Sequence, residues 1–477
     1  MPAGKSRTSW IAGVASESVP TRRRIVMDVD LLVIGWGKAG KTLAGRFAAA
    51  GKTVALVERS PEMYGGTCIN IGCVPTKDLV VSAEERRDSD DPQEFFRTAV
   101  AGRDALIGTL NAANHQMLEK RGVTLVDGTA RFTGPRTVVV DTAEGQVELT
   151  GETVVIGTGA TSRRVDLPGF DSPRVFDSTT IQHIDPLPER LVIVGGGFIG
   201  LEFASMFTHF GSKVTILDRG EEFLPRVDRD VAEAVRQTLL DMGVTIEQGV
   251  RPTSLDDDGT HAVVHTTKGD FAAEAVLVAA GRVPVTGELG LEAAGIEVDE
   301  RGFVVVDDQL QTSVPGVYAV GDVNGGPQFT YISLDDNRIV WDAVMGQGTR
   351  RRSDRVAVPN TTFITPPLSM VGMDETQARK SGRNVLMAKK EVAKIAAMPR
   401  PKIVGETHGL FKLFVDADSQ EILGATIFSI DSQELVNMVA LAIRLGAKVS
   451  DLRDGIWTHP SSTEAFNEVL GTLEPLA

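Results

Sequence analysis

The chain has two cysteines in 477 residues, and they lie five positions apart, at Cys68 and Cys73. They belong to the segment Gly-Gly-Thr-Cys-Ile-Asn-Ile-Gly-Cys-Val-Pro-Thr-Lys, which ends at Lys77. A disulfide between them closes a very short loop, so it would stabilise the fold less than a bridge that closes a long loop. A bridge that is made and broken explains the spacing better. The cysteine pattern therefore predicts a redox dithiol rather than a structural disulfide.

A second pattern occurs twice. It consists of an apolar run, a Gly-x-Gly-x-x-Gly turn, a helix-like segment and a second apolar run that ends in an acid. In both copies the acid follows the first glycine by 23 residues. The residues are Gly35, Gly37, Gly40 and Glu58 in the first copy, and Gly195, Gly197, Gly200 and Asp218 in the second.

These two units are typical of dinucleotide-binding folds. The first glycine allows a tight turn, the second lets the backbone approach a pyrophosphate, and the third lets the helix pack on the strand. The helix N-terminus then faces the phosphates, and the acid accepts hydrogen bonds from ribose hydroxyls. Two dinucleotides and a dithiol indicate an electron relay between a nicotinamide and a flavin. Because the cysteines follow the first unit closely, we expect the flavin there and NAD(P)H on the second unit.

The cysteine segment resembles the active site of the pyridine nucleotide–disulfide oxidoreductases. This family includes dihydrolipoamide dehydrogenase, glutathione reductase and mercuric reductase. The resemblance extends from about Met27 to the C-terminus. Residues 158–160 are similar to the end of the family's first FAD segment, residues 312–322 to its second flavin motif, and residues 459–464 to its C-terminal His-Pro-x3-Glu signature.

Four segments depart from the common pattern of the family, at residues 38–44, 63–66, 328–336 and 365–369. They are similar instead to the bacterial flavoproteins of reactive-chlorine resistance. That branch lies near mercuric reductase and is linked to oxidant defence and copper-ion reduction.

The resemblance implies an α/β fold with two Rossmann-like dinucleotide-binding domains, for FAD and NAD(P), and a C-terminal α+β dimerisation domain. We expect the FAD domain at 28–160 and 287–356, the NAD(P) domain at 161–286 and the dimerisation domain at 357–477. Within the last domain we expect a strand at 409–415 and a helix at 434–445. The basic run at 350–355 is expected to be a solvated linker.

Residues 1–27 stand apart from this fold. Their apolar patch is too short for the core of a signal peptide. We expect a disordered tail or a start codon further downstream than the first methionine.

The resemblance also implies roles for the site residues. Cys73 is the thiol next to the flavin, and Cys68 is the interchange thiol that meets the oxidant. A position at a helix N-terminus lowers the pKa of a thiol. Lys77 lies near the flavin N5 and pairs with Glu202. The implied FAD contacts are Gly35, Gly37, Gly40, Glu58, Gly66, Thr67, Lys77, Thr158, Gly159, Gly321 and Asp322; the implied NAD(P) contacts are Gly195, Gly197, Phe198, Ile199, Gly200, Asp218, Arg219 and Gly281.

His459 is implied as the acid/base for Cys68, oriented by Glu464. In the family this histidine comes from the partner subunit, so the implied active unit is a homodimer. Phe198 takes the place of a tyrosine lid found in many relatives. Asp218 favours NADH because it bonds a free ribose 2′-OH and repels a 2′-phosphate, which Arg219 and Arg226 partly offset.

Composition limits the partners. The net charge is −15 and the isoelectric point is near 5.1, which disfavours nucleic acid and anionic membranes. No apolar run approaches the length of a membrane span. A dithiol fed by NAD(P)H is expected to work in the cytoplasm, where the pyridine nucleotides are.

The electron acceptor is a small molecule or a metal ion. A second cysteine pair, which mercuric reductase uses to shuttle its metal and the large thioredoxin reductases also carry, is missing from the sequence. We expect no resident metal site, and we interpret Asp335 and Asp336 as polar positions at a helix start.

Three hypotheses remain open. The first is a reductase of metal ions, of copper or mercuric type, in oxidant defence. The second is a disulfide reductase such as dihydrolipoamide dehydrogenase, which the retained His459 permits. The third, from another class, is a non-catalytic flavoprotein that senses NAD(P)H.

Overall fold

The computed structural model describes residues 25–476, so most of the expected N-terminal tail lies outside the described residues. Residues 25–27, which we expected in that tail, instead begin strand β1 (Ile25–Ile34). They pair with Val147, Glu148 and Leu149 of β6 (Gly145–Ile156). The folded chain thus begins earlier than expected because the strand ladder extends beyond the buried part of β1.

The first sheet contains the strands on either side of the first glycine turn and a strand of the second flavin motif. Its order is β3 (Thr124–Asp127), β2 (Val54–Glu58), β1, β6, β5 (Thr137–Thr142) and β4 (Thr129–Gly134), and β17 (Val317–Ala319) also pairs with β6. Strands β3, β2, β1, β6 and β17 are parallel. The second half of β1 and all of β2 are buried, as expected for parallel strands covered on both faces.

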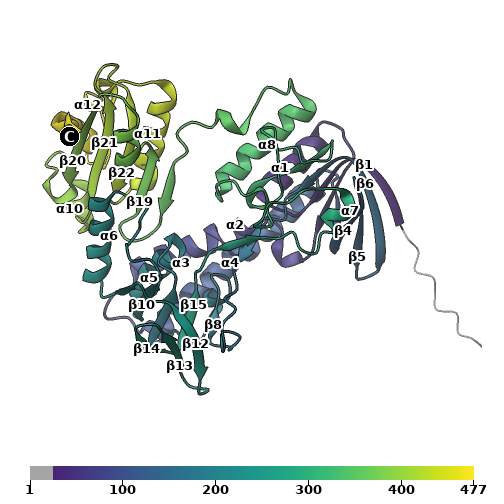
Figure 1. Cartoon of the computed structure of the whole chain (residues 1–477), viewed down its shortest axis with the longest axis horizontal. Helices are drawn as coiled ribbons and strands as arrows, with labels where there is room; N and C mark the ends of the chain where they lie inside the picture. Colours follow the sequence, from purple (N-terminus) through teal and green to yellow (C-terminus); the bar gives the residue numbers. More distant parts are fainter. Residues whose placement is uncertain (1–24, 477) are drawn as a thin grey trace, which may run out of the picture.

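Helices from two separate segments of the chain belong to this part of the described structure. Helix α1 (Lys38–Ala49) connects β1 to β2 and lies beside α8 (Thr330–Met345) (Figure 1). After β2 come α2 (Thr67–Asn70), α3 (Cys73–Glu85) and the long α4 (Pro92–Glu119). Cys68 is therefore the second residue of α2, and Cys73 is the first residue of α3.

The second sheet is entirely parallel and carries the second glycine turn. Its order is β11 (Thr245–Gln248), β10 (Lys213–Asp218), β9 (Arg190–Val194), β15 (Ala275–Val278) and β8 (Val175–Phe176). Helices α5 (Phe198–Phe210) and α6 (Arg229–Asp241) belong to it, with an antiparallel sheet of β12 (Pro252–Asp257), β13 (Ala262–Thr266) and β14 (Gly269–Ala273).

Two short strands carry the chain between the first and the second sheet. The chain leaves the first sheet through β7 (Ala160–Ser162) and returns through β16 (Arg282–Pro284), and the two strands pair in antiparallel fashion. Short α7 (Leu291–Ala294) follows. The unit that carries the second glycine turn is therefore an insertion with adjacent ends.

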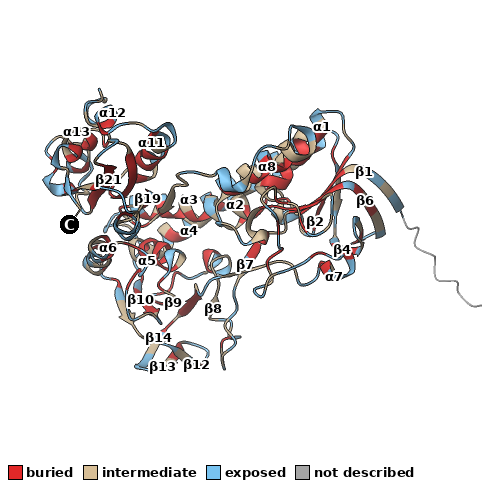
Figure 2. Cartoon of the chain, turned by 45° about the horizontal axis from the view of Figure 1, so that its top comes forward, coloured by how far each residue is buried: buried red, intermediate tan, exposed pale blue. Residues whose placement is uncertain are grey.

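The C-terminal part is an antiparallel sheet with helices. Its order is β18 (Asn360–Thr362), β19 (Leu368–Gly372), β22 (Ile422–Phe428), β21 (Leu410–Asp416), β20 (Val385–Glu391) and β23 (Glu474–Pro475). The helices are α9 (Glu375–Lys380), α10 (Arg400–Val404), α11 (Ser432–Leu445), α12 (Val449–Arg453) and α13 (Ala465–Val469). Figure 2 shows β21 as buried throughout, between its neighbours and the helices.

The basic run at 350–355 differs from expectation at its end. The Arg355 side chain is 14% exposed, and its Nε lies 2.9 Å from Asp335 Oδ2. The same guanidinium contacts Asp336, which is 1% exposed. Both aspartates lie inside α8 rather than at its start. Arg355 is therefore not a solvated linker residue, because α8 supplies two carboxylates that fix it.

Among the described residues, no helix combines the length and the apolar character needed to cross a membrane.

Candidate active site

The two glycine turns have the same geometry. Gly35 and Gly195 have φ of +95° and +121°, a backbone region that side chains disfavour. A Cβ at Gly40 would lie 2.9 Å from the Gly35 carbonyl oxygen, and one at Gly200 would lie 2.1 Å from that of Gly195. The first and third glycines are therefore required by the protein itself.

The second glycine of each turn faces open space. A Cβ at Gly197 would meet no protein atom within 4 Å, and one at Gly37 would meet only the Gly157 carbonyl oxygen, at 3.3 Å. Both residues are N-caps, of α5 and α1, without a side-chain cap. In α1 the Ala39 N–H already donates to Ser333 Oγ at 3.1 Å. The N-terminus of each helix nevertheless faces a place where an anion can approach the backbone, which fits a dinucleotide pyrophosphate.

The acids that end the second strands lie close to these turns. Glu58 is 9% exposed, and its Oε2 accepts the Trp36 N–H at 3.0 Å. Burial raises the pKa of Glu58, against the opposing effect of the backbone N–H groups of Trp36, Arg59 and Ser60. In the second unit, a Cβ at Gly196 would lie 2.7 Å from Asp218 Oδ2. Both carboxylates are thus placed where a ribose next to the pyrophosphate would lie.

The remaining residues predicted to contact the nucleotides lie around the two turns. Gly66 and Thr67 enclose the first turn, since a Cβ at Gly66 would lie 2.8 Å from Gly37 Cα and Thr67 begins α2. Gly159 and Gly281 are open, with no atom within 4 Å of a built Cβ. The Thr158 hydroxyl donates to the Val285 carbonyl at 2.7 Å, and the Gly321 N–H donates to Asp336 at 2.6 Å. Asp322 is half-buried and follows β17. The remaining three are Phe198, which is 44% exposed, Ile199 and Arg219.

The two cysteines are free thiols and differ in charge. The Cys73 Sγ lies 3.6 Å from Thr330 Oγ1. A hydrogen bond from Cys68 lowers the pKa of Cys73 to about 6; burial opposes this shift, and Thr330 and Lys77 reinforce it. The same bond raises the pKa of Cys68, with burial acting in the same direction. Cys73, the first residue of α3, therefore carries the thiolate, and Cys68 keeps the proton.

Lys77 and Glu202 form the expected pair. The distance from Lys77 Nζ to Glu202 Oε2 is 2.5 Å, and the other carboxylate oxygen accepts the Phe363 N–H at 2.8 Å. The Glu202 side chain is 11% exposed, so this is not an ordinary surface ion pair. A cavity of about 440 Å³ is lined by Cys73, Val74, Lys77, Asp78, Val81 and Leu106. The thiolate and the ammonium of Lys77 therefore face one space.

His459 and Glu464 form a second pair, away from the dithiol. His459 Nδ1 lies 2.8 Å from Glu464 Oε1, and the other oxygen of Glu464 accepts the Ser461 N–H at 2.8 Å. The His459 side chain is 71% exposed. Helices α12 and α13, which flank it, lie well apart from α2 and α3 (Figure 2). Within one chain, the structure thus separates His459 from the cysteines.

Family models match most of the chain. Residues 29–336 match the model described as pyridine nucleotide-disulphide oxidoreductase, and residues 358–470 match its dimerisation domain. The chain belongs to the pyridine nucleotide-disulphide oxidoreductases. As a member, it is an oxidoreductase that uses FAD and NAD(P)H, with two dinucleotide-binding domains and a dimerisation domain that indicates a homodimer.

Similar proteins come from several branches of this family. The chain is 43% identical to the probable pyridine nucleotide-disulfide oxidoreductase RclA of Escherichia coli, over 93% of this chain and 99% of RclA. It is 34% identical to dihydrolipoyl dehydrogenase of Haloferax volcanii, over 93% and 96% of the two chains. It is 32% identical to mercuric reductase of Bacillus cereus, over 94% of this chain and 72% of that protein.

The fold agrees with solved structures of the family. A Cu(II) complex of the HOCl-induced flavoprotein disulfide reductase RclA from Escherichia coli superposes with a TM-score of 0.89 at 44% identity, over 93% of this chain and 99% of that chain. The resemblance to the reactive-chlorine branch is therefore confirmed.

Two residues of this oxidoreductase's site escape sequence reasoning. Thr330 contacts Cys73, and Lys41, on α1, donates to Asn114 Oδ1 at 2.7 Å and to the Gly65 carbonyl at 3.2 Å. Both lie in segments that depart from the common family pattern, and this departure is the signal that could have led to them. Their contacts with the cysteine loop join distant parts of the sequence, so no local pattern predicts them.

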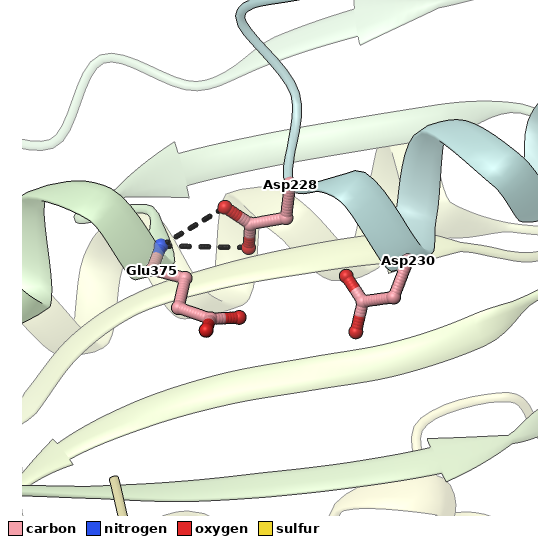
Figure 3. A group of neighbouring side chains, drawn as sticks. All are labelled: Asp228, Asp230 and Glu375. Atoms are coloured by element: carbon pink, nitrogen blue, oxygen red, sulfur yellow. Dashed lines mark hydrogen bonds between the residues drawn. The ribbon is translucent and has the colours of Figure 1, made fainter. Parts of the chain in front are cut away.

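A third group, of carboxylates, lies between the second and the C-terminal domain of this oxidoreductase. Figure 3 shows Asp228, Asp230 and Glu375 facing one another, in an arrangement that can hold a metal ion. The Lys412 ammonium occupies the group, with Nζ 3.0 Å from Asp228 Oδ2, 3.0 Å from Asp230 Oδ1 and in contact with Glu375. Because Lys412 is 0% exposed, it supplies the buried counter-charge itself.

Proposed function

We propose that this flavoprotein passes electrons from NAD(P)H through Cys68 and Cys73 to a metal ion of the copper type, in defence against oxidants. The observation that carries this proposal is the identity of 43% to RclA over nearly the whole of both chains, together with the Cu(II) complex of RclA among the matching structures. Paired thiolates also suit soft metal ions.

The chain's own residues supply the parts of this relay. The first glycine turn and Asp322 would hold FAD, which when bound would supply the two-electron chemistry between NAD(P)H and the disulfide form of the cysteine pair. As the S–S bond breaks, Cys73 holds a thiolate beside Lys77 and Thr330, and Cys68 takes one proton. Oxidation by two Cu(II) ions then re-forms the S–S bond, releases that proton and yields two Cu(I) ions.

Glu202 orients the positive charge in this scheme. Its carboxylate fixes the Lys77 ammonium at 2.5 Å, on the cavity that Cys73 lines. The ammonium lowers the pKa of Cys73, while Glu202 acts in the opposite direction. Glu202 therefore holds Lys77 in place, but its negative charge cancels part of the effect of Lys77 on the pKa of Cys73.

A second candidate function is the reduction of a disulfide such as lipoamide. The specific observation in its favour is the His459–Glu464 hydrogen bond of 2.8 Å, since an oriented imidazole can protonate a departing thiolate. In a homodimer, the partner subunit would bring this imidazole to Cys68.

The nicotinamide and the compartment belong to the same proposal. The Asp218 carboxylate, set against the second glycine turn, favours NADH because it repels a 2′-phosphate. Arg219 and Arg226 are exposed and are free to offset this preference in part. We place the enzyme in the cytoplasm, where NADH is oxidised and regenerated.

The test is anaerobic oxidation of NADH and NADPH by the purified FAD enzyme with Cu(II), Hg(II), lipoamide or glutathione disulfide, with Cys68→Ser in parallel. Fast turnover with Cu(II) that depends on Cys68 supports the proposal. Fast turnover with lipoamide alone would place the enzyme with the disulfide reductases. Activity in cells that survives Cys68→Ser would favour the third hypothesis, a non-catalytic sensor of NAD(P)H.

His459→Ala separates the two catalytic candidates. We expect it to slow oxidation of the dithiol by disulfides by about a hundredfold, the typical contribution of a general acid, and to leave flavin reduction by NADH nearly unchanged. Stopped-flow measurement of both half-reactions checks this. Equal losses in the two half-reactions would contradict the role given to His459.

A further inference from the structure

Lys41 is a buried cation without an acidic partner. It is 7% exposed, and its two hydrogen bonds go to neutral oxygens, those of the Gly65 carbonyl and the Asn114 side chain. No carboxylate of the described residues lies within ion-pair distance of its ammonium. Burying a charge is costly unless something compensates it, so an uncompensated ammonium in a core position calls for an explanation.

The Lys41 ammonium is hydrogen-bonded to the loop that leads to Cys68. Lys41 projects from the first turn of α1 to the loop at Gly65, which leads within three residues to Cys68. The charged groups that act on Lys41 are Lys38, on the same helix, and Cys68. Burial, with the repulsion of Lys38, lowers the pKa of Lys41 to about 8, and Cys68 opposes this shift.

Three groups from three elements influence the pKa of Cys68. They are the Cys73 thiol of α3, the Thr330 hydroxyl of α8 and the Lys41 ammonium of α1. Cys73 favours the protonated form of Cys68, whereas Thr330 and Lys41 favour its thiolate. Among these, Lys41 alone carries a positive charge. When Cys73 no longer bears negative charge, Lys41 is therefore the cation of the same chain that favours the Cys68 thiolate.

We propose that Lys41 is a positioning residue that stabilises the thiolate of Cys68 at the moment this thiol meets the acceptor. The inference rests on the proposed function only in assigning that meeting to Cys68. Thiolates, not thiols, attack electrophiles and bind soft metals, so the ammonium sets the reactive fraction of Cys68. No carboxylate of the described residues neutralises this ammonium, so its charge, present below its pKa of about 8, acts on the sulfur.

The test measures Cys68 alone, in FAD-loaded Cys73→Ser protein without any acceptor. The rate of alkylation by iodoacetamide is followed from neutral to alkaline pH in this parent and in three variants of it. Lys41→Gln removes the charge but keeps a donor. Lys41→Arg keeps the charge. Asn114→Asp leaves Lys41 in place and pairs its ammonium with a carboxylate of the same size as the native amide.

We expect Lys41→Gln and Asn114→Asp to move the midpoint of alkylation upward by about one pH unit, a roughly tenfold loss of rate at neutral pH. Lys41→Arg is expected to stay near the parent. A midpoint in Lys41→Gln equal to that of the parent would overturn the proposal, since a lysine that merely ties down the Gly65 loop predicts that result. If Lys41→Gln fails to retain FAD, an unchanged midpoint in Asn114→Asp overturns it instead.

This test is independent of the acceptor. Copper reduction can fail while the alkylation midpoints shift as expected, in which case the role of Lys41 stands and the proposed function does not. The reverse outcome, copper turnover with unshifted midpoints, would reject Lys41 alone.

Discussion

The two thiols of the dithiol are chemically different although they share one short segment. Cys73 begins α3 and receives hydrogen bonds from Cys68 and Thr330, whereas Cys68 meets a partner that is already negative. Thiolate character at Cys73 therefore depends on neighbours from α2 and α8 as well as on its own helix N-terminus. Thr330, 257 positions further along the chain, thus tunes the pKa of the Cys73 thiol.

Thr330→Val is expected to raise the pKa of Cys73, because the hydroxyl that favours the thiolate is replaced by a methyl group of similar size. The folded-state pKa is near 6, so the thiolate is present above that pH and lost below it. Removal of one hydrogen bond to a charged group is expected to shift the titration to higher pH by about one unit. Thiolate absorbance of Cys68→Ser protein, with and without Thr330→Val, measures this.

The matched control is Thr109→Val on α4, which removes an exposed threonine hydroxyl that donates to the Ala105 carbonyl and not to the sulfur. It is expected to leave the titration unchanged. Equal titration curves for Thr330→Val and Thr109→Val would show that the hydroxyl does not act on Cys73.

Residue types in a local pattern were predictable from sequence, and long-range neighbours were not. The glycines of both turns and the acids after them follow from strand–turn–helix chemistry within about 23 residues. Lys41 and Thr330 gain their meaning only when α1 and α8 come to lie beside the cysteine loop. From sequence alone a lysine is predicted to lie on the surface, because lysines are rarely buried.

At the scale of elements, α5 connects three parts of the molecule. Its first turn closes the second glycine turn, and one face of it binds residues outside its own domain. Glu202 accepts from Lys77 of α3 and from the Phe363 N–H, and Ser205 Oγ accepts the Thr365 N–H at 3.2 Å. Glu202 and Ser205, three positions apart on one face of α5, therefore bind the backbone at the start of the C-terminal domain.

Glu202→Gln is expected to destabilise the protein by about 1–3 kcal/mol, because Lys77 loses its counter-charge while Phe363 keeps an acceptor. Midpoints of urea unfolding of the holoprotein measure this. Glu189→Gln is the control: its pair with Lys213 has side chains 72% and 77% exposed, and it is expected to cost little. Similar midpoints for both variants would mean that Glu202 acts like a surface residue.

The two segments that differ from the sequence prediction do so for one physical reason. The start of β1 at Ile25 and the burial of Arg355 both depend on pairing with residues far along the chain, β6 in one case and α8 in the other. A run of charged or mixed residues gives no periodicity that reveals such a partner. The long apolar strands and α11, by contrast, carry their pattern locally.

At the scale of the whole molecule, Lys412 ties two domains together. It lies on β21 of the C-terminal sheet, while Asp228 and Asp230 lie at the start of α6 in the inserted domain. Glu375 begins α9, and its N–H donates to Asp228 Oδ1 at 3.1 Å. In Figure 1, α6 lies between the inserted domain and the C-terminal sheet. The buried cluster therefore fixes the position of one domain against the other.

Lys412→Met is expected to destabilise the protein by about 3–5 kcal/mol, because three carboxylates lose their buried counter-charge. Thermal unfolding of the holoprotein measures the change. Lys448→Met removes a lysine whose pair with Glu421 is exposed and is expected to shift the transition little. A transition of Lys412→Met as high as that of Lys448→Met would rule out a structural role for the cluster.

The pairing of β17 with β6 has a consequence for the order in which the protein is made. Residues 317–319 complete the parallel face of the first sheet beside residues 154–156, yet the ribosome delivers them only after the whole inserted unit between β7 and β16. Because domains fold as units during synthesis, the inserted unit can close while the first sheet still lacks a strand and Asp322. With the two nucleotides assigned as proposed above, a nascent chain arrested before β17 would therefore bind nicotinamide nucleotide before it could hold a flavin.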